Sequence, residues 1–348
     1  MTVRIHELSA RTDPRGESYS LPLPFTSIAE CHVATIRPAS IRGNHFHTQR
    51  RELLTVLYAD RWTLFWDEGE GTDVQSRAFE GTGAVLIDSD PLCAHAVRND
   101  GASDLQIVSL GDTATTDTFP RVVTPALTKI AGVDGCREGW IAAIKDKTSI
   151  EVRIVRSDDE LLALIAQCAF IAIDVPIGLP ETGARTADER ARRFIGRRGS
   201  SVFPAPIRAL LGATDYRDAN RISKDLQEKG ISQQAFAFIP KIAQIDRILQ
   251  AHPELRGRVH EIHPEVSFSS WNGKPMEDPK TTREGLAARR ALVSAHFGPI
   301  PPTPRGANED DLLDAMAALW TAERILGETS EFFGGEPDAT GLPMKIAY

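Results

Sequence analysis

The segment Phe170–Val175, with the sequence FIAIDV, constrains the fold of this chain more than any other. It is apolar almost throughout, whereas a strand with one face in water alternates apolar and polar residues. It therefore predicts a buried central strand of an α/β sheet. The other strands of this sheet are predicted at Ile130–Asp134, Trp140–Lys145, Ile150–Arg156 and Val259–Ile262.

Helices are predicted between and after these strands. The first begins at Ser157, an N-cap residue that has Glu160 three positions later, and runs to about Cys168. The other helices are predicted near Asp188–Ile195, Ala219–Lys229, Ile239–Ala251, Glu284–His296 and Glu309–Leu326. The order β-β-β-α-β-α-β-α, with helical insertions, is the topology of the RNase H-like superfamily.

The first third of the chain has a different pattern. Short β-branched and aromatic runs are separated by Gly, Asp and Asn, which predicts an all-β sandwich or barrel. Its strands are predicted at His32–Ile36, Leu53–Tyr58, Trp62–Trp66, Ala84–Ile87 and Leu105–Leu110.

The 348 residues are about twice the usual size of a single domain, so two hydrophobic cores are expected. A stretch rich in Thr, Asp and Pro begins at Gly111 and lacks any period, which predicts a linker. We therefore predict a multidomain protein with a β-barrel at residues 1–115, a linker at 116–128 and an α/β domain at 129–348.

Composition limits the partners and the compartment. A net charge of -8 argues against a broad basic surface for nucleic acid, so any such contact must be local. The four cysteines form no CxxC pair, which indicates neither disulfides nor a thiolate zinc site. The N-terminus lacks the apolar core of a signal peptide, and no apolar run approaches the roughly eighteen residues of a membrane span. We expect a cytoplasmic protein without a membrane partner.

Acidic residues stand where the predicted strands end. Asp134 ends the first strand of the α/β domain, Asp174 ends the fourth and Glu261 lies at the end of the fifth. Asp311 and Asp314 lie three residues apart near the start of the last helix, so they share one face of it. A buried acid is unfavourable unless it is paired or binds a cation, so these residues predict one acidic cleft.

Oxygen ligands of this kind suit Mg²⁺ or Mn²⁺. We predict that Asp134, Asp174, Asp311 and Asp314 bind the metal, that Glu261 supports them, and that all five are catalytic. Two such ions about 4 Å apart stabilise the attacking and leaving oxygens of a phosphodiester. The alternative is structural, because acids in a first helical turn are favoured by the helix dipole and Asp before Gly or Val-Pro is common in turns.

Six sequence blocks in the second half of the chain are distinctive. In order they are GVDGCREGW, AIDVPIGLP, GRRGSSVFPAPIR, IPKIAQID, EIHPEVSF and EDDLLDAMAALWTAER. They resemble, in the same order, a family of predicted nucleases of RNase H-like fold (domain of unknown function 429), over nearly all of residues 130–348. The resemblance implies the fold, and the nuclease activity is an expectation that follows from the fold.

The block GRRGSSVFPAPIR predicts a loop that holds phosphate. Its arginines are Arg197, Arg198 and Arg208, and the amides of Gly199, Ser200 and Ser201 are expected to form an anion-binding nest. The alternative is a solvated helix face followed by a rigid proline loop.

Three basic residues in the neighbouring blocks have two interpretations each. His260 and His263 flank Glu261, where a histidine can transfer a proton or bind metal, but structural histidines are more common. Lys241 either balances the acids or is an ordinary surface lysine.

The β-domain carries a second candidate site. His45 and His47 alternate, so on a strand they point to the same face, and Glu52 and His95 follow them. The pattern resembles that of cupins, in particular the RmlC-like cupins of nucleotide-sugar metabolism. The resemblance implies a site for Zn²⁺, Fe²⁺, Ni²⁺ or Mn²⁺, or a metal-free site in which the histidines act alone. A barrel core kept only for binding or dimerisation is the alternative.

Three functions remain open from the sequence. The leading hypothesis is a metal-dependent nuclease acting on nucleic acid or a nucleotide, in which the cupin senses a ligand or forms a homodimer. The second is a cupin that isomerises or epimerises a nucleotide sugar, with His45 or His47 as the base. The third is a non-catalytic protein that binds a metabolite. The absence of GxxxxGK[ST] argues against a P-loop ATPase but not against an actin-like ATPase.

Overall fold

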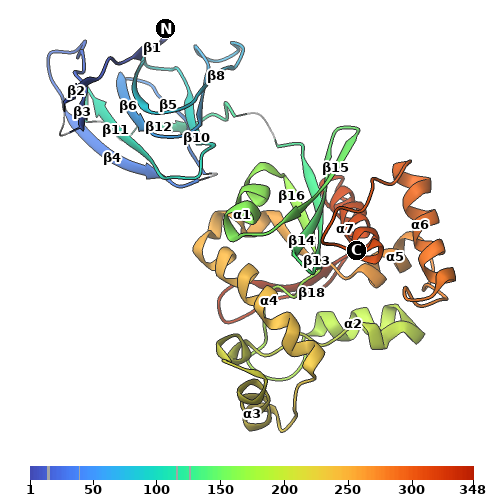
Figure 1. Ribbon diagram of the computed structural model, residues 1–348. Coiled ribbons are helices and arrows are strands. Elements are labelled where there is room, and N and C mark those ends of the chain that lie inside the picture. The colour runs from blue at the N-terminus through green and yellow to red at the C-terminus, as the bar shows by residue number, and fades with distance from the viewer. Residues whose placement is uncertain (14–15, 39, 115–116, 125–126) are drawn as a thin grey trace. The chain divides into compact units, whose positions relative to one another are not determined.

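The computed structural model describes residues 1–13, 16–38, 40–114, 117–124 and 127–348. The chain divides into two compact units, Met1–Ala126 and Leu127–Tyr348, which we describe separately (Figure 1). Within the described residues, no helix has the length and apolarity that crossing a membrane requires.

The N-terminal unit consists of two five-stranded antiparallel sheets and a small hairpin. In spatial order, the first sheet contains β1 (Val3–Glu7), β9 (Gly83–Ser89), β6 (Glu52–Tyr58), β11 (Leu105–Gly111) and β4 (Glu30–Ile36). The second contains β12 (Thr118–Pro120), β5 (Ile41–His47), β10 (His95–Asn99), β7 (Trp62–Trp66) and β8 (Gln75–Phe79). The hairpin consists of β2 (Arg11–Asp13) and β3 (Gly16–Ser18).

Strands that follow one another in the chain mostly alternate between the two sheets, which is the jelly-roll arrangement of cupins. The sheets share one core, in which Leu54 and Val56 of β6 pack with Trp62 and Leu64 of β7. The expected all-β cupin fold is therefore confirmed. The strands predicted from the sequence do not include β1, β2, β3, β5, β8, β10 or β12, because polar residues interrupt the apolar pattern of these segments. For β5 the sequence indicated only that His45 and His47 would share one face if they lay on a strand.

The expected linker at residues 116–128 differs from the structure. Thr118–Pro120 forms β12, which pairs with β5 and so belongs to the cupin sheet. The Asn44 side-chain oxygen also accepts hydrogen bonds from the backbone nitrogens of Val123 (3.0 Å) and Thr124 (3.3 Å). Residues 116, 125 and 126 of this stretch lie outside the described residues. A stretch whose Thr- and Pro-rich composition predicted a linker thus contains a short edge strand.

The C-terminal unit is built on one sheet with the order β15 (Ser149–Val155), β14 (Gly139–Asp146), β13 (Ile130–Cys136), β16 (Phe170–Ile173) and β17 (Val259–Glu261). The first three strands are antiparallel, whereas β16 and β17 run parallel to β13. This is the RNase H-like arrangement expected from the sequence, and Phe170–Ile173 is a central strand as its apolar composition predicts.

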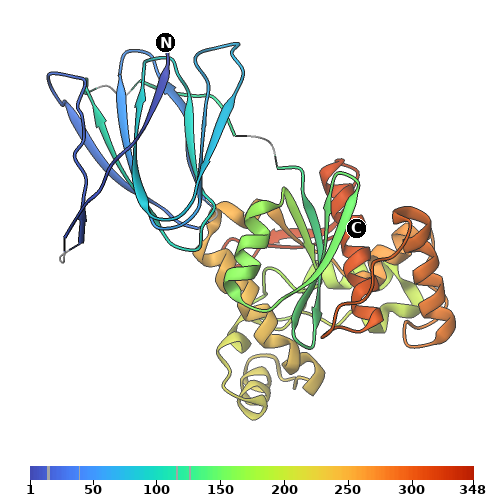
Figure 2. The same ribbon diagram turned by 45° about the horizontal axis from the view of Figure 1, so that its top comes forward.

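Helices cover both faces of this sheet (Figure 2). They are α1 (Asp158–Gln167), α2 (Thr186–Phe194), α3 (Tyr216–Gln227), α4 (Gln233–Ala251), α5 (Pro264–Trp271), α6 (Arg283–Phe297) and α7 (Glu309–Leu326). Three short 3₁₀ turns accompany them, η1 (Gly196–Ser201), η2 (Arg208–Gly212) and η3 (Pro253–Arg258). A C-terminal hairpin of β18 (Phe332–Pro337) and β19 (Pro343–Ala347) was not anticipated from the sequence.

Helix α7 lies directly against β13, and a glycine makes this contact possible. A Cβ atom at Gly132 would lie 2.0 Å from the backbone nitrogen of Leu319, closer than atoms can approach. Side chains alternate along a strand, so Asp134 points to the same face of the sheet as Gly132. Consequently Asp134 faces α7, the helix that carries Asp314.

Candidate functional site

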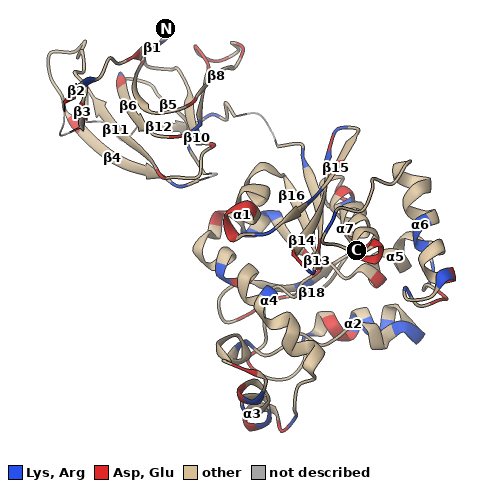
Figure 3. Cartoon of the chain, in the orientation of Figure 1, with Lys and Arg blue, Asp and Glu red and all other residues tan. Residues whose placement is uncertain are grey.

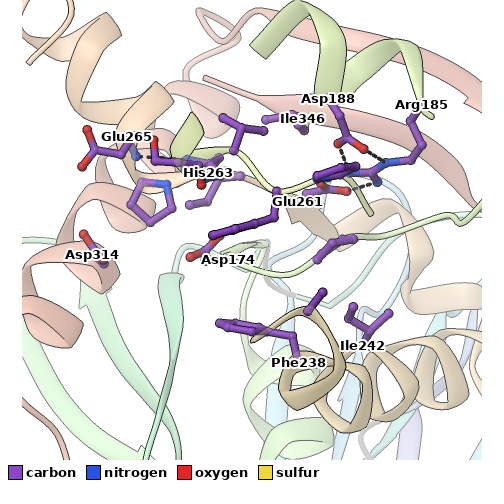
Figure 4. Close-up of a pocket in the computed structure, with 18 of the residues that line it drawn as sticks. Asp174, Arg185, Asp188, Phe238, Ile242, Glu261, His263, Glu265, Asp314 and Ile346 are labelled. Carbon is purple, nitrogen blue, oxygen red and sulfur yellow. Dashed lines mark hydrogen bonds and ion pairs between the residues drawn. The ribbon is translucent and has the colours of Figure 1, made fainter. Parts of the chain in front are cut away.

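A cavity of about 550 Å³ opens beyond the carboxyl ends of β16 and β17 (Figure 4). Asp174 directly follows β16, and Glu261 is the last residue of β17. Ligands of open α/β sheets bind at this edge, because the connections between strand and helix diverge there. The polar residues that line the cavity are Asp174, Arg185, Asp188, Arg198, Ser201, Gln234, Glu261, His263, Glu265, Lys280 and Asp314.

Asp174 and Asp314 line the cavity, and Asp134, which does not line it, lies next to both of them. Asp134 and Asp314 are 7% and 2% exposed, so water screens their charges poorly. Burial, followed by repulsion from Asp174 and Asp314, raises the pKa of Asp134 well above its usual value. Burial also raises the pKa of Asp174, whose carboxylate accepts a hydrogen bond from Asp134, and raises the pKa of Asp314 to about 7. The expected convergence of acids from β13, β16 and α7 is thus present.

Lys280 is the cation of this group, and the sequence reading missed it. Its Nζ lies 2.5 Å from Asp314 Oδ2 and 3.8 Å from Asp310 Oδ2. Burial alone would lower the pKa of Lys280, but the carboxylates of Asp314, Asp134 and Asp174 outweigh burial and raise it. One ammonium group cannot neutralise three carboxylates, so the site favours either protonated acids or an additional cation.

Asp311 is placed differently from the prediction. Its side chain accepts a hydrogen bond from the Asn308 backbone nitrogen at 2.8 Å and completes the capping box that starts α7. The residue does not line the cavity. The structural alternative, an acid that stabilises a helix N-terminus, therefore describes Asp311, and Asp314 one turn later is the residue that reaches the acids.

Glu261 also has a partner that the sequence reading did not assign. Its carboxylate accepts two hydrogen bonds from the buried Arg185 guanidinium, at 2.6 and 2.7 Å, and a third from the Ile177 backbone nitrogen at 2.7 Å. Arg185 also binds Asp188 at 2.5 Å. Burial raises the pKa of Glu261 to about 7, against the opposing effect of Arg185. Glu261 lines the cavity but belongs to this buried ion-pair network and not to the Asp134 group.

The predicted phosphate loop is only partly assembled. Residues Gly196–Ser201 form η1, and Gly199, Ser200 and Ser201 all have negative φ, so the expected amide nest is not formed. Arg198 and Ser201 line the cavity, whereas Arg197 and Ser200 are exposed outside it.

Arg208 takes a structural role in place of the predicted one. It forms ion pairs with Asp246, at 2.9 Å, and with Asp338. Helix α2 carries acids in its first turn and Arg192 and Arg193 in its last, as the helix dipole favours. Figure 3 shows this separation of acidic and basic residues along α2.

Glu265 is a buried cavity residue that the sequence reading missed, although it lies within the EIHPEVSF block. Its Oε1 accepts hydrogen bonds from the buried Arg289, at 2.6 Å, and from Arg198, at 3.5 Å. Its Oε2 is buried and has no hydrogen-bond partner within the described chain. A buried carboxylate oxygen without a hydrogen bond is unfavourable unless the group is protonated or gains a partner.

The two histidines of that block have structural surroundings. The His263 Nδ1 accepts a hydrogen bond from the Glu265 backbone nitrogen and caps α5, which leaves Nε2 to donate to the Ser201 carbonyl at 3.2 Å. His260 lies next to Phe170 and Phe332, and burial lowers its pKa to about 4.

Lys241 is half-buried and not an ordinary surface residue. Its ammonium lies 4.4 Å from the centre of the Trp140 ring and donates to the Gly139 carbonyl. Burial lowers its pKa, against the attraction of Cys136, Asp134 and Asp311. It therefore contributes positive charge near the acids but does not line the cavity.

The cupin unit brings its candidate residues together between its sheets. Potential ligand atoms of His45, Glu52 and His95 all lie within 4.8 Å of one another. His47 Nε2 lies 3.6 Å from Glu52 Oε2, while His47 Nδ1 donates to the Asp117 carbonyl at 3.0 Å. Burial opposes ionisation of Glu52, but His47 and His95 outweigh it and hold the pKa of Glu52 well below its usual value. Three of the four predicted residues thus converge, with His47 beside them.

Solved structures similar to this chain match its cupin third. A sugar 3,4-ketoisomerase (QdtA) from Thermoanaerobacterium thermosaccharolyticum, in complex with TDP, is 14% identical over 34% of this chain and 86% of its own, with a TM-score of 0.29. The dTDP-6-deoxy-D-glucose-3,5-epimerase RmlC from Legionella pneumophila is 14% identical over 34% and 71%, with a TM-score of 0.30. A 3,4-ketoisomerase from Helicobacter canadensis is 17% identical over 34% and 90%, with a TM-score of 0.29.

A search among curated proteins finds no match to the sequence. A protein-family model, in contrast, matches the α/β unit. The family model described as "Protein of unknown function (DUF429)" matches residues 132–339, which is more than half of the chain and spans the Asp134, Asp174 and Asp314 positions. The chain therefore belongs to the DUF429 family, with a cupin unit preceding the family domain.

Proposed function

We propose that this protein is a metal-dependent hydrolase that cleaves phosphodiesters at the cavity of its α/β unit. The observation that carries the proposal is the convergence of Asp134, Asp174 and Asp314, of which Asp134 and Asp314 are buried and all three have raised pKa values. Their oxygen-only donor set fits Mg²⁺ or Mn²⁺. An ion bound by these three acids would supply the charge that polarises a phosphoryl group and activates water.

The residues of the chain have distinct roles in this proposal. The three aspartates hold the ion, and the ammonium of Lys280 offsets the charge that the ion leaves unneutralised. Arg198 faces the same cavity and donates to a phosphate oxygen. Water adds to phosphorus, the bond from phosphorus to the leaving alcohol breaks, and the leaving oxygen takes up the proton.

The proposal is tested by thermal unfolding of the full chain with and without metal. Mg²⁺ or Mn²⁺ should raise the melting temperature of the wild type, because the ion binds only the folded acids. Asp134→Asn should weaken this increase and reduce cleavage of bis(p-nitrophenyl) phosphate by at least about 100-fold, a loss typical of a key electrostatic group.

The matched control is Asp225→Asn, which removes the same charge from an exposed position on α3. It should retain both the metal-dependent increase and the wild-type rate. An Asp134→Asn variant that cleaves at the wild-type rate would contradict the proposal, as would a wild type whose melting temperature does not respond to either metal.

A second candidate function rests on the cupin unit, because the buried Glu52 and His95 form a compact group with the half-buried His45. Two imidazoles and one carboxylate suit Zn²⁺, Fe²⁺, Ni²⁺ or Mn²⁺, and without metal the same residues can transfer protons. We propose isomerisation or epimerisation of a nucleotide sugar as this alternative. Elemental analysis of the purified protein and an NMR assay of proton exchange in a dTDP-4-keto sugar test it, with His95→Asn expected to abolish either signal.

A further inference from the structure

One wall of the cavity is apolar and aromatic. Phe203, Pro204, Pro206, Phe238 and Ile242 line it, and the Phe203 and Phe238 residues are 57% and 49% exposed. Neither ring stacks on another aromatic side chain within the described residues. Figure 4 shows Phe238 and Ile242 on α4, across the cavity from Glu261 and Asp188. Exposed aromatic rings gathered at a cavity mark a binding surface for a flat apolar group.

This wall is held in place before any ligand arrives. Pro204 and Pro206 restrict the backbone on both sides of Ala205, whose nitrogen donates to the buried carboxylate of Asp188 at 2.9 Å. Phe203 follows Val202, whose carbonyl accepts a hydrogen bond from Arg192 at 2.9 Å. A rigid wall lowers the entropy that binding must oppose.

Arg198 and Glu265 line the other side of the cavity. The Glu265 Oε2 and the Arg198 Nε are buried and make no hydrogen bond within the described chain. The Arg198 side chain as a whole is 19% exposed, and its guanidinium lies 3.5 Å from Glu265 Oε1. An anionic oxygen of a ligand would pair with this guanidinium.

The charges of the lining argue against a bound polymer. Asp174, Asp188, Glu261, Glu265 and Asp314 supply carboxylates, while Arg185 is already committed to Glu261 and Asp188. A groove that follows a nucleic-acid strand requires cations along its length. The cavity volume of about 550 Å³ lies within the range of roughly 300–1,000 Å³ typical of small-molecule sites.

We propose that the cavity binds one small nucleotide whose phosphate is a diester, such as a cyclic nucleotide, with its base stacked on Phe203 and Phe238 and its phosphate directed to Arg198 and the acid end. The phosphate placement rests on the proposed function, whereas the base placement rests on the aromatic wall alone. The proposal thus assigns a small molecule, and not a nucleic acid, as the ligand of this site.

Calorimetry on the full chain with Mg²⁺ tests the proposal with three probes: adenosine 5′-monophosphate, which is the product of hydrolysing the 3′,5′-cyclic diester, ribose 5-phosphate, and a single-stranded oligonucleotide. The nucleotide should bind about 5- to 150-fold more tightly than the sugar phosphate, which corresponds to the stacking of one base. Phe238→Ala should remove most of this difference and leave ribose 5-phosphate binding unchanged. Phe238→Tyr keeps the aromatic ring and should retain the difference in affinity between the nucleotide and the sugar phosphate.

The control is Leu226→Ala, which removes an exposed apolar side chain from α3 away from the cavity lining. Equal affinity for nucleotide and sugar phosphate would overturn the proposal, and so would an oligonucleotide that binds more tightly than the nucleotide and does not respond to Phe238→Ala. If Phe238-dependent nucleotide binding is found in a protein that metal does not stabilise, the base site stands and the hydrolase fails. If metal stabilises the protein but the base adds no affinity, the base site fails and the proposed hydrolase stands.

Discussion

Glu52 of the cupin unit and Asp134 of the α/β unit are both buried acids on sheet strands, yet their pKa values move in opposite directions. Glu52 faces His47 and His95, whose hydrogen bonds to its carboxylate outweigh the penalty of burial. Asp134 faces Asp174 and Asp314, so repulsion adds to the penalty. Burial by itself therefore does not determine the state of an acid, because the residues opposite it decide the sign.

Within the α/β unit, burial raises the pKa of both Glu261 and Asp314 to about 7, and the difference between these two acids lies in their partners. Glu261 lies one strand away from Asp174, but the Arg185 guanidinium engages both of its oxygens. Among the described residues, Asp314 forms its ion pair with Lys280, whose ammonium also lies near Asp310. The paired acid belongs to the framework of the fold, and the acids with too little positive charge form the candidate site.

Removing the partner of a paired acid should have the largest effect. Arg185→Met leaves Glu261 and Asp188 buried without a cation, and breaking such a pair costs about 3–5 kcal/mol. Urea unfolding followed by tryptophan fluorescence measures the loss. Arg193→Met is the control, because its ion pair with Glu189 is exposed and should contribute less than about 0.5 kcal/mol. A loss below that of the control would show that Glu261 is neutral in the folded protein.

Glu52→Gln should destabilise the cupin unit. The substitution removes the charge that faces His47 and His95 and weakens its bond with Ser109, at a cost of about 1–3 kcal/mol. Hydrogen exchange of the amides in β6, resolved by peptide, reports the change. Unchanged protection of β6 would mean that the histidines do not hold Glu52 ionised.

In the absence of metal, Asp134→Asn should stabilise the α/β unit, in contrast to the two destabilising substitutions above. Loss of one negative charge relieves repulsion from Asp174 and Asp314, so the free energy of unfolding of the α/β unit should rise by about 1 kcal/mol at pH 8. The measurement is urea unfolding in EDTA. With Mg²⁺ present the wild type should be more stable than Asp134→Asn, because only the wild type gains the full binding energy of the ion. A variant that is less stable than the wild type in EDTA would contradict this explanation.

The pH dependence of stability should differ in slope between the two units. Asp314 has an ordinary pKa of 3.8 and a folded pKa of about 7, so the folded state binds the extra proton and metal-free stability falls as pH rises from about 4 to about 7. Glu52 has a lowered pKa, so its contribution is complete above its ordinary value of 4.5 and is lost below it. Each proton difference changes stability by about 1.4 kcal/mol per pH unit.

Peptide-resolved hydrogen exchange on the full chain between pH 3.5 and 7.5, corrected for the intrinsic exchange rate, tests these slopes. Peptides from β13 and α7 should lose protection as pH rises through this range, whereas peptides from β6 should lose it only at the acidic end. If protection changes with pH in the same way in both units, the proposed difference between Glu52 and Asp314 is wrong.

The sequence by itself determined the features that depend on local spacing. The apolar run at Phe170–Ile173 defined a central strand, and acids after strands were expected to meet at one edge of the sheet. His45 and His47 were expected on one face of a strand because side chains alternate. The strands and helices of the α/β unit were therefore largely predictable, apart from α5 and the terminal hairpin of β18 and β19.

Only the tertiary structure decided which charged groups meet. Asp311 and Asp314 share a helical turn, yet one caps the helix and the other reaches the acids. Glu261 meets Arg185 across 76 residues of chain, and Asp314 meets Lys280 across 34. Such pairs leave no periodic signal, because the strength of a charge interaction depends on distance in space and on exclusion of water. The sequence thus located the acids, and the packing around them determined which acids remain available to a metal.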